Sequence, residues 1–186
     1  MRPRYGTRGI VLARTPLAEA SASLSMLTEE FGLIRARAQG IRKPGAKLAG
    51  AVQTFAECDV ILVRGKDGWR LSGANLVHNR FRDLSPDGRK RAGRIASLML
   101  RLIHGEANDP IPFTLFAEFL EVLPTLSEAQ ADAAETLVAL RLLTFLGLAD
   151  TALPETGYAG ELLEKITQER SDYIRKINRG LSASGL

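Results

Sequence analysis

The hydrophobic period of this chain changes near Arg80, and the change limits the fold more than any other feature. Before Arg80, short segments rich in Val, Ile, Leu, Phe and Thr alternate with glycines and turn residues about every ten to fifteen residues, which is typical of β-strands. After Arg80, apolar residues recur with a period of about 3.6, which is typical of helices. We therefore expect an α+β chain with one domain over residues 1–80 and a helical domain over 81–186.

The first domain is predicted to hold five strands that close into a small β-barrel. The strands are expected at residues 7–13, 22–28, 33–39, 55–63 and 69–77. The sequence Glu30-Phe31-Gly32 predicts the turn between the second and third strands. Gly65 and Gly68 flank the turn that joins the last two strands, because glycine tolerates the positive φ that tight turns demand.

Four helices are predicted in the second domain. Ser85 and Pro86 can begin the first helix and Gly105 can end it. The other three are expected at residues 113–123, 127–147 and 158–179. The second and third helices are apolar almost all the way round, which favours the centre of a bundle, with an exposed groove that accepts a partner peptide as the alternative.

The net charge of +4 hides a segregation of charge along the chain. Residues 1–80 carry 13 cations and 6 anions, or +7, whereas residues 81–186 carry 12 and 15, or −3. Five cations and no acid lie within residues 35–47, on a predicted strand and the loop that follows it. These are Arg35, Arg37, Arg42, Lys43 and Lys47. The alternation of a strand predicts that Arg35 and Arg37 project from one face while Ile34 points to the other.

A basic strand face on a small barrel is a common way to hold single-stranded nucleic acid, with cations along the backbone and rings stacked on bases. The rings available in the barrel are Phe31, Phe55 and Trp69, and each has a place in the core as the alternative to base stacking. A solvated surface is the alternative for the basic row itself. A second basic run, Arg89-Lys90-Arg91, is a further candidate for nucleic-acid contact.

Catalytic and metal-binding motifs are absent from the sequence. It contains no nucleophile elbow, no phosphate-binding glycine loop and no H-E-x-x-H pair, and its single cysteine, Cys58, and two histidines, His78 and His104, favour structural roles. We therefore expect no enzyme activity, no cofactor and no metal. No apolar run is long enough to cross a bilayer and no secretory signal is present, which predicts a cytoplasmic protein without a membrane partner.

Arg141 is the only cation in the acidic stretch from residue 105 to 164. Two roles are open for it: a buried partner in an ion pair, or a receptor for a carboxylate from outside the chain. Either role would set Arg141 apart from the apolar side chains around it on the predicted third helix.

Several segments resemble a known family in order and spacing. They are Arg8 to Leu12, Leu27 to Ala36, Gly40 to Pro44, Leu48 to Gln53 and Asp59 to Leu62, followed by the first helix and by Leu140 to Leu143 and Leu146 to Ala149. Together, over about residues 7–150, these segments resemble the bacterial recombination mediator RecO. The resemblance is stronger in the first half of the chain.

The resemblance implies an oligonucleotide/oligosaccharide-binding (OB) barrel followed by a helical domain, in a nucleoid-associated protein. Members of the family bind single- and double-stranded DNA, anneal complementary strands, and load RecA with RecR and in some cases RecF. Many also bind the acidic C-terminal tail of single-strand-binding protein. By position, the five cations of residues 35–47 fall in the DNA-contacting region, and Arg141 falls in the region associated with tail capture.

This chain departs from the family pattern in two respects. It has no cysteine cluster where some members carry zinc, so no metal is predicted, and it is shorter after residue 150. The alternative function is a protein-interaction adaptor that binds an acidic peptide without significant DNA affinity. An RNA-binding accessory shares the barrel and the basic row, and the residues alone do not separate it from a DNA-binding protein.

Overall fold

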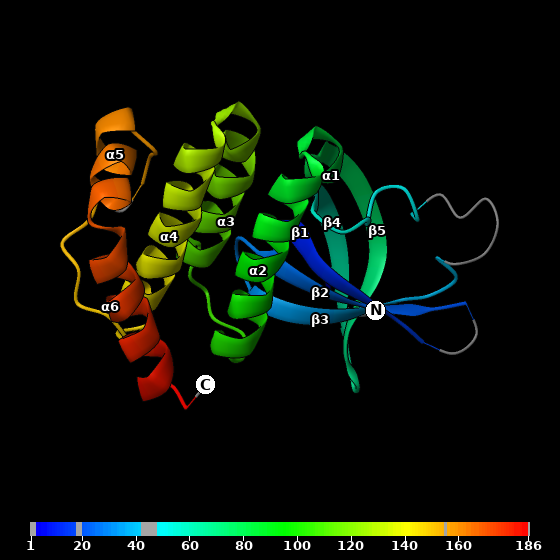
Figure 1. Ribbon diagram of the computed structural model, residues 1–186. Coiled ribbons are helices and arrows are strands. Elements are labelled where there is room, and N and C mark those ends of the chain that lie inside the picture. Colours follow the sequence, from blue (N-terminus) through cyan, green and yellow to red (C-terminus); the bar gives the residue numbers. More distant parts are fainter. Residues whose placement is uncertain (1–2, 18–19, 42–47, 155, 186) are drawn as a thin grey trace. The chain divides into compact units, whose positions relative to one another are not determined.

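A computed structural model describes residues 3–17, 20–41, 48–154 and 156–185 of the chain. These residues form two units (Figure 1). The first unit comprises Met1–Asp83 with Ile103–Phe113, and the second comprises Leu84–Leu102 with Thr114–Leu186. The first unit contains the strands and the second contains most of the helices, so each is described on its own.

The strands described in the first unit form a closed barrel with the order β1-β2-β3-β5-β4. They are β1 (Arg4–Pro16), β2 (Ala22–Thr28), β3 (Gly32–Ala38), β4 (Ala56–Gly65) and β5 (Gly68–Asn79). All neighbouring strands run antiparallel except β3 and β5, which run parallel. This is the Greek-key arrangement of an OB fold, and it confirms the fold class predicted from the sequence.

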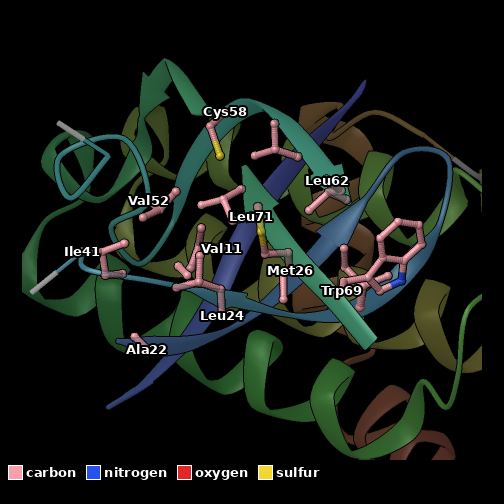
Figure 2. Close-up of a cluster of buried hydrophobic side chains, with 14 residues drawn as sticks. Val11, Ala22, Leu24, Met26, Ile41, Val52, Cys58, Leu62, Trp69 and Leu71 are labelled. Carbon is pink, nitrogen blue, oxygen red and sulfur yellow. The ribbon is translucent and has the colours of Figure 1, made fainter. Parts of the chain in front are cut away.

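Alternating side chains fill the interior of the barrel. On β3, Ile34 and Ala36 are buried while Arg35 and Arg37 are exposed, which confirms the predicted alternation of this strand. Leu24 and Met26 of β2 are fully buried in the same core cluster (Figure 2). Removing these aliphatic side chains from water supplies the main driving force for closing the sheet.

Cys58 belongs to this interior as a small apolar residue. Its side chain is fully buried (Figure 2), and its Sγ donates to the carbonyl oxygen of Gly9 at 3.6 Å. Burial raises the pKa of the Cys58 thiol to about 12, with smaller contributions from the charges of Asp59 and Glu57. The thiol therefore stays neutral at physiological pH, and neutral thiols are poor nucleophiles.

The segment Ile103–Phe113, which we call the strap, lies with the barrel although it follows the first long helix in sequence. Glu106 of the strap forms an antiparallel bridge with Gly32, the first residue of β3. Gly32 has φ +62°, and a Cβ at this position would lie 2.7 Å from the carbonyl oxygen of Ala107. Only glycine permits this close approach of two backbones.

The helices described in the second unit surround α4. The elements after the barrel are α1 (Arg80–Asp83), α2 (Pro86–Leu102), α3 (Ile111–Val122), the 3-10 helix η1 (Leu123–Thr125), α4 (Glu128–Phe145), α5 (Gly160–Gln168) and α6 (Arg170–Ala183). Helix α4 packs against α2, α5 and α6 (Figure 1), which agrees with its all-round apolar sequence. Among the described residues, no helix is apolar over a sufficient length to cross a membrane.

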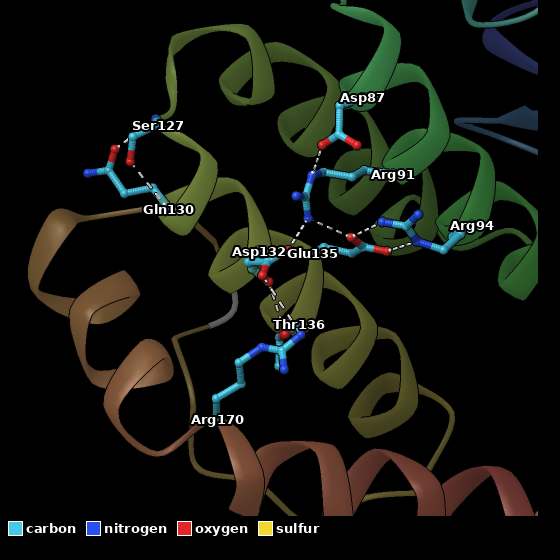
Figure 3. Close-up of polar contacts among 9 residues, drawn as sticks. All are labelled: Asp87, Arg91, Arg94, Ser127, Gln130, Asp132, Glu135, Thr136 and Arg170. Atoms are coloured by element: carbon cyan, nitrogen blue, oxygen red, sulfur yellow. Dashed lines mark hydrogen bonds and ion pairs between the residues drawn. The ribbon is translucent and has the colours of Figure 1, made fainter.

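Local signals explain where α4 begins. Ser127 Oγ accepts a hydrogen bond from the backbone N–H of Gln130 at 3.4 Å, and the Gln130 side chain accepts one from the Ser127 N–H at 3.1 Å (Figure 3). This reciprocal arrangement is a capping box, and a Ser followed three residues later by Gln is the sequence pattern typical of one.

The prediction of one continuous helix over residues 158–179 was wrong. The chain forms two helices that meet at Glu169, where φ is −97° and ψ is 18°. Residues 167–172 are all polar, so no buried apolar side chain fixes the helical register across the junction. Ile166 of α5 and Tyr173 of α6 are the buried residues on either side of this polar stretch.

We expect Gly32→Ala to lower the free energy of unfolding of the barrel by about 2–4 kcal/mol, because it combines backbone strain with a clash against Ala107. Gly105→Ala is the control: its φ is +79° and a Cβ there meets nothing within 4 Å, so it should cost only about 1 kcal/mol. Urea unfolding followed by the fluorescence of Trp69 measures both values. Equal costs would contradict the proposed contact between Gly32 and the strap.

Candidate nucleic-acid interface

The outer face of β3 carries exposed cations opposite small polar residues. Arg35 pairs in register with Ser25 and Arg37 pairs with Ser23 on the neighbouring strand β2. Side chains at paired positions share a face of the sheet, so hydroxyl groups lie beside these two guanidinium groups on that strand.

On the other side of β3, the parallel pairing with β5 brings a further arginine into the row. Arg37 and Arg70 are register partners, and both are exposed. Arg70 in turn pairs with Val63, which pairs with Arg4 on β1. Cations from three strands therefore lie in one cross-strand row on the outside of the barrel.

A shallow groove of about 220 Å³ follows part of this row. Its lining includes Arg37, Gln39, Lys66, Trp69 and Arg70. Asp67, in the turn between β4 and β5, is the acidic residue in the lining. The excess of positive charge makes the groove suited to an anionic, extended ligand.

Other arginines of the barrel form ion pairs with acidic side chains, whereas the cations of the row do not within the described residues. Arg8 lies 3.3 Å from Asp59, and Arg80 lies 3.0 Å from Glu57. No ion pair joins Arg4, Arg35, Arg37, Lys66 or Arg70 to another residue within the described part of the chain. We call Arg4, Arg35, Arg37, Lys66 and Arg70 the barrel cations. Their charge is not neutralised by described carboxylates.

The predicted cations of the barrel and the barrel cations that the structure shows overlap only in part. Arg42, Lys43 and Lys47 lie outside the described residues, so their role stays a prediction. Arg4, Lys66 and Arg70 were not predicted. The alternation of Trp69-Arg70-Leu71 could have marked Arg70 as outward-facing, but only the parallel closure of the barrel sets it beside Arg37.

The aromatic residues serve the barrel interior more than its surface. Phe55 and Trp69 are 4% and 7% exposed, so the core role, which was the alternative to base stacking, applies to both. Phe31 is half-buried, with its ring centroid 5.2 Å from that of Trp69. Tyr5 meets Trp69 edge-on at 5.3 Å. The ring cluster stabilises the end of the barrel near the groove.

The run Arg89-Lys90-Arg91 does not form a common basic surface, because successive residues of a helix point about 100° apart. Lys90 is exposed and Arg89 half-buried, but Arg91 is buried. The Nε of Arg91 donates to Asp87 at 2.8 Å, and its Nη1 donates to Asp132 and Glu135 (Figure 3). Because this guanidinium is fully engaged within the helical unit, we withdraw Arg91 from the candidate interface.

The acids around Arg91 hold a second arginine as well. Arg94 donates to Glu135 at 2.5 and 2.7 Å (Figure 3). Burial lowers the pKa of Arg91, whereas its hydrogen bonds to Asp132 and Asp87 raise that pKa. The hydrogen bonds and the nearby charges outweigh burial, so the pKa lies above its ordinary value. Arg91 and Arg94 both belong to α2, and Asp132 and Glu135 belong to α4. The network therefore joins these two helices.

Arg141 forms no ion pair with a described carboxylate, whereas its predicted role as a receptor for a carboxylate from outside the chain stays a prediction. It is 5% exposed, and it donates to the carbonyl oxygens of Pro154, Thr156 and Gly157 at 2.8 Å. Its Nη1 is buried without a described partner, and its Cζ lies 5.1 Å from the ring centroid of Tyr158. Arg141 thus holds the loop that precedes α5.

The histidines and acidic residues show no catalytic arrangement in the described part of the chain. His78 Nε2 lies 2.6 Å from Asp83 Oδ2, on the surface of the barrel unit. Within residues 3–17, 20–41, 48–154 and 156–185, no group of three or more His, Cys, Asp or Glu side chains could hold a metal ion. The unpaired barrel cations are therefore the feature that best suggests a function.

Comparison with known proteins agrees with the fold. Residues 1–80 match the family model described as "Recombination protein O N terminal". DNA repair protein RecO of Dehalococcoides mccartyi is 29% identical over 127 residues, which cover 68% of this chain and 50% of the relative. DNA repair protein RecO of Nostoc punctiforme is 31% identical over 133 residues, or 70% of this chain and 44% of the relative. The chain thus matches half or less of each relative's length.

We expect Arg91→Ala to destabilise the helical unit by about 1–3 kcal/mol, because it leaves Asp132 and Glu135 close together without their shared cation. Lys90→Ala, at the exposed neighbouring position, should change stability by less than about 0.5 kcal/mol. Thermal unfolding followed by circular dichroism at 222 nm checks both. If the two variants unfold alike, the network does not stabilise the unit.

Proposed function

We propose, because this chain belongs to the RecO family, that it is a DNA-binding mediator of recombinational DNA repair. The observation that carries the proposal is the in-register pair of exposed arginines, Arg37 and Arg70, on the groove side of an OB barrel. The barrel cations give the DNA backbone a row of donors with no described carboxylate paired to them.

The proposed mechanism is electrostatic. Each phosphate that meets a guanidinium or ammonium group releases condensed counterions, and this release drives binding regardless of base sequence. Neutralising the phosphates of two strands also lowers the repulsion between them, so complementary bases can meet and anneal. The chemistry requires no nucleophile, general base or metal, and so the protein would act without being an enzyme.

The protein partners of this function rest on the family alone. We propose that the chain works with RecR, and in some settings RecF, to help load RecA onto DNA coated by single-strand-binding protein. Single- and double-stranded DNA are both proposed as ligands, in a cytoplasmic, nucleoid-associated setting.

A second candidate function is binding of an acidic peptide, such as the C-terminal tail of single-strand-binding protein, without significant DNA affinity. The observation that favours it is the buried Nη1 of Arg141, which has no described hydrogen-bond partner, in a guanidinium whose Cζ lies 5.1 Å from the ring centroid of Tyr158. Burial raises the pKa of Tyr158, so its hydroxyl keeps a proton to donate. A carboxylate that reached both groups could accept a hydrogen bond from each of them.

We expect single-stranded DNA affinity to fall with salt along a log–log slope near −3, since about four contacted phosphates contribute roughly −0.7 each. Replacing Arg37 and Arg70 together by Gln should bring the slope to roughly −1.4, because two of the four contacts remain. Fluorescence anisotropy of labelled oligonucleotides at several salt concentrations measures this. Arg8→Gln is the matched control, because Arg8 already pairs with Asp59 on the same barrel.

A flat salt response in the unmodified protein would contradict DNA binding by the barrel. An unchanged slope in the Arg37→Gln, Arg70→Gln protein would assign the contacts to other cations, such as Arg35 or those at 42, 43 and 47. Circular dichroism should give the same spectrum for both proteins, since both arginines are exposed.

The two candidate functions separate in a direct comparison. The mediator should bind labelled single-stranded DNA and speed the annealing of complementary oligonucleotides. The adaptor should bind a labelled acidic peptide and leave both DNA measurements at background. Anisotropy with each probe in the same buffer decides between them, and a peptide signal without a DNA signal would favour the adaptor.

A further inference from the structure

One carboxylate of the barrel unit occupies a place where a phosphate could bind. Glu106 of the strap accepts hydrogen bonds at a single oxygen, Oε1, from Arg64 Nη1 and from the indole Nε1 of Trp69, the latter at 3.0 Å. The guanidinium of Arg64 also stacks on Trp69, with its Cζ 4.7 Å from the ring centroid. Two donors thus converge on one acidic oxygen at the end of the barrel.

This contact lies next to the groove of the barrel cations. Trp69 lines that groove together with Arg37 and Arg70, and Arg64 is the register partner of Trp69 on β4. Arg64 is therefore adjacent to the basic row, but it differs from the barrel cations because a carboxylate neutralises it. The other acid near the groove, Asp67, belongs to the turn between β4 and β5 and forms no ion pair with a described residue.

From this geometry we infer that Arg64 is a further phosphate-binding residue of the groove, and that Glu106 is its internal competitor. In the free protein the carboxylate of Glu106 takes the position of a phosphate. When a nucleic-acid strand enters the groove, a phosphate oxygen displaces Glu106 from Arg64 and Trp69. This inference rests on the proposed DNA-binding function and extends the site by one residue.

The exchange is chemically balanced, because a phosphate offers the same kind of acceptor as the carboxylate it replaces. Guanidinium groups bind both anions through charge-assisted hydrogen bonds. The side chains of Arg64 and Glu106 are 46% and 43% exposed, so water screens their ion pair and the released carboxylate returns to solvent. Exposed pairs of this kind contribute little to stability, which makes the exchange easy.

The backbone of the strap can stay in place during the exchange. The bridge between Gly32 and Glu106 holds the main chain, while Glu106 rotates about its own side-chain bonds. The competitor therefore remains tethered near Arg64 at a high local concentration, and it limits the affinity of the groove for any anion. A neutral side chain at position 106 should remove this limit.

The first test removes the charge of Glu106 while keeping an oxygen acceptor for Trp69. Glu106→Gln should raise the affinity for labelled single-stranded DNA by about two- to fivefold at low salt, in the range of one exposed charge pair. In an Arg64→Gln background, the same substitution should change affinity by less than about twofold, because the two residues act on each other. Glu161→Gln, an exposed acid on α5, controls for net charge.

The second test uses the position of Trp69, which is the only tryptophan of the chain. In the unmodified protein, single-stranded DNA should change the emission of Trp69 with the same midpoint as the anisotropy titration, since the indole exchanges its hydrogen-bond partner. In Glu106→Gln, the emission without DNA should already differ from that of the unmodified protein. Glu161→Gln should match the unmodified protein in both respects.

These outcomes distinguish failure of the competitor role of Glu106 from failure of the proposed DNA-binding function. If the unmodified protein binds DNA but Glu106→Gln behaves like Glu161→Gln, the competitor role of Glu106 is wrong and the proposed function stands. If Glu106→Gln raised the DNA affinity equally with and without Arg64, the competitor role would also be wrong. The gain would then come from the change in net charge and not from release of Arg64. If neither protein binds DNA at any salt concentration, the proposed function fails and this inference fails with it.

Discussion

The parallel pairing of β3 with β5 is the constraint on which the surface of this barrel depends. The pairing joins strands that are separated in sequence by the whole of β4, and it sets Arg37 beside Arg70 and Ala36 beside Trp69. The inward partners close the core, and the outward partners bring two positive charges together. That proximity raises the electrostatic energy of the free protein, which a bound polyanion would lower.

Local patterns in the sequence were sufficient for most of the fold but not for the site. The period-two pattern around Ile34 and the capping box at Ser127 act over a few residues, so they could be read directly. The position of Arg70 beside Arg37 depends on barrel closure, which no local pattern encodes. The run at 89–91 is the opposite case. Three adjacent cations predicted one basic surface, but successive residues of a helix point in different directions, so the three side chains do not share a face.

The arginines of this chain serve different physical purposes according to their surroundings. Arg91 and Arg141 are buried, and Arg91 donates to carboxylates while Arg141 donates to backbone carbonyl oxygens. Arg35 and Arg37 are exposed and have no described carboxylate partner. Counting positive charges cannot separate these groups, because burial and pairing are properties of the folded chain. Exposed arginines without a described carboxylate partner, such as Arg35 and Arg37, are therefore the better candidates for contact with a nucleic acid.

The strap also affects how the barrel behaves as an isolated fragment. A fragment that ends at Asp83 contains every strand that the structure describes, yet it lacks the return of Ile103–Phe113 and with it the backbone bridge to Gly32. Its tryptophan and Arg64 would be uncovered, and one more positive charge would face solvent. If Glu106 limits the affinity of the groove as inferred above, such a fragment should bind an anion more tightly than the intact chain does, and dissection into domains would overstate the affinity.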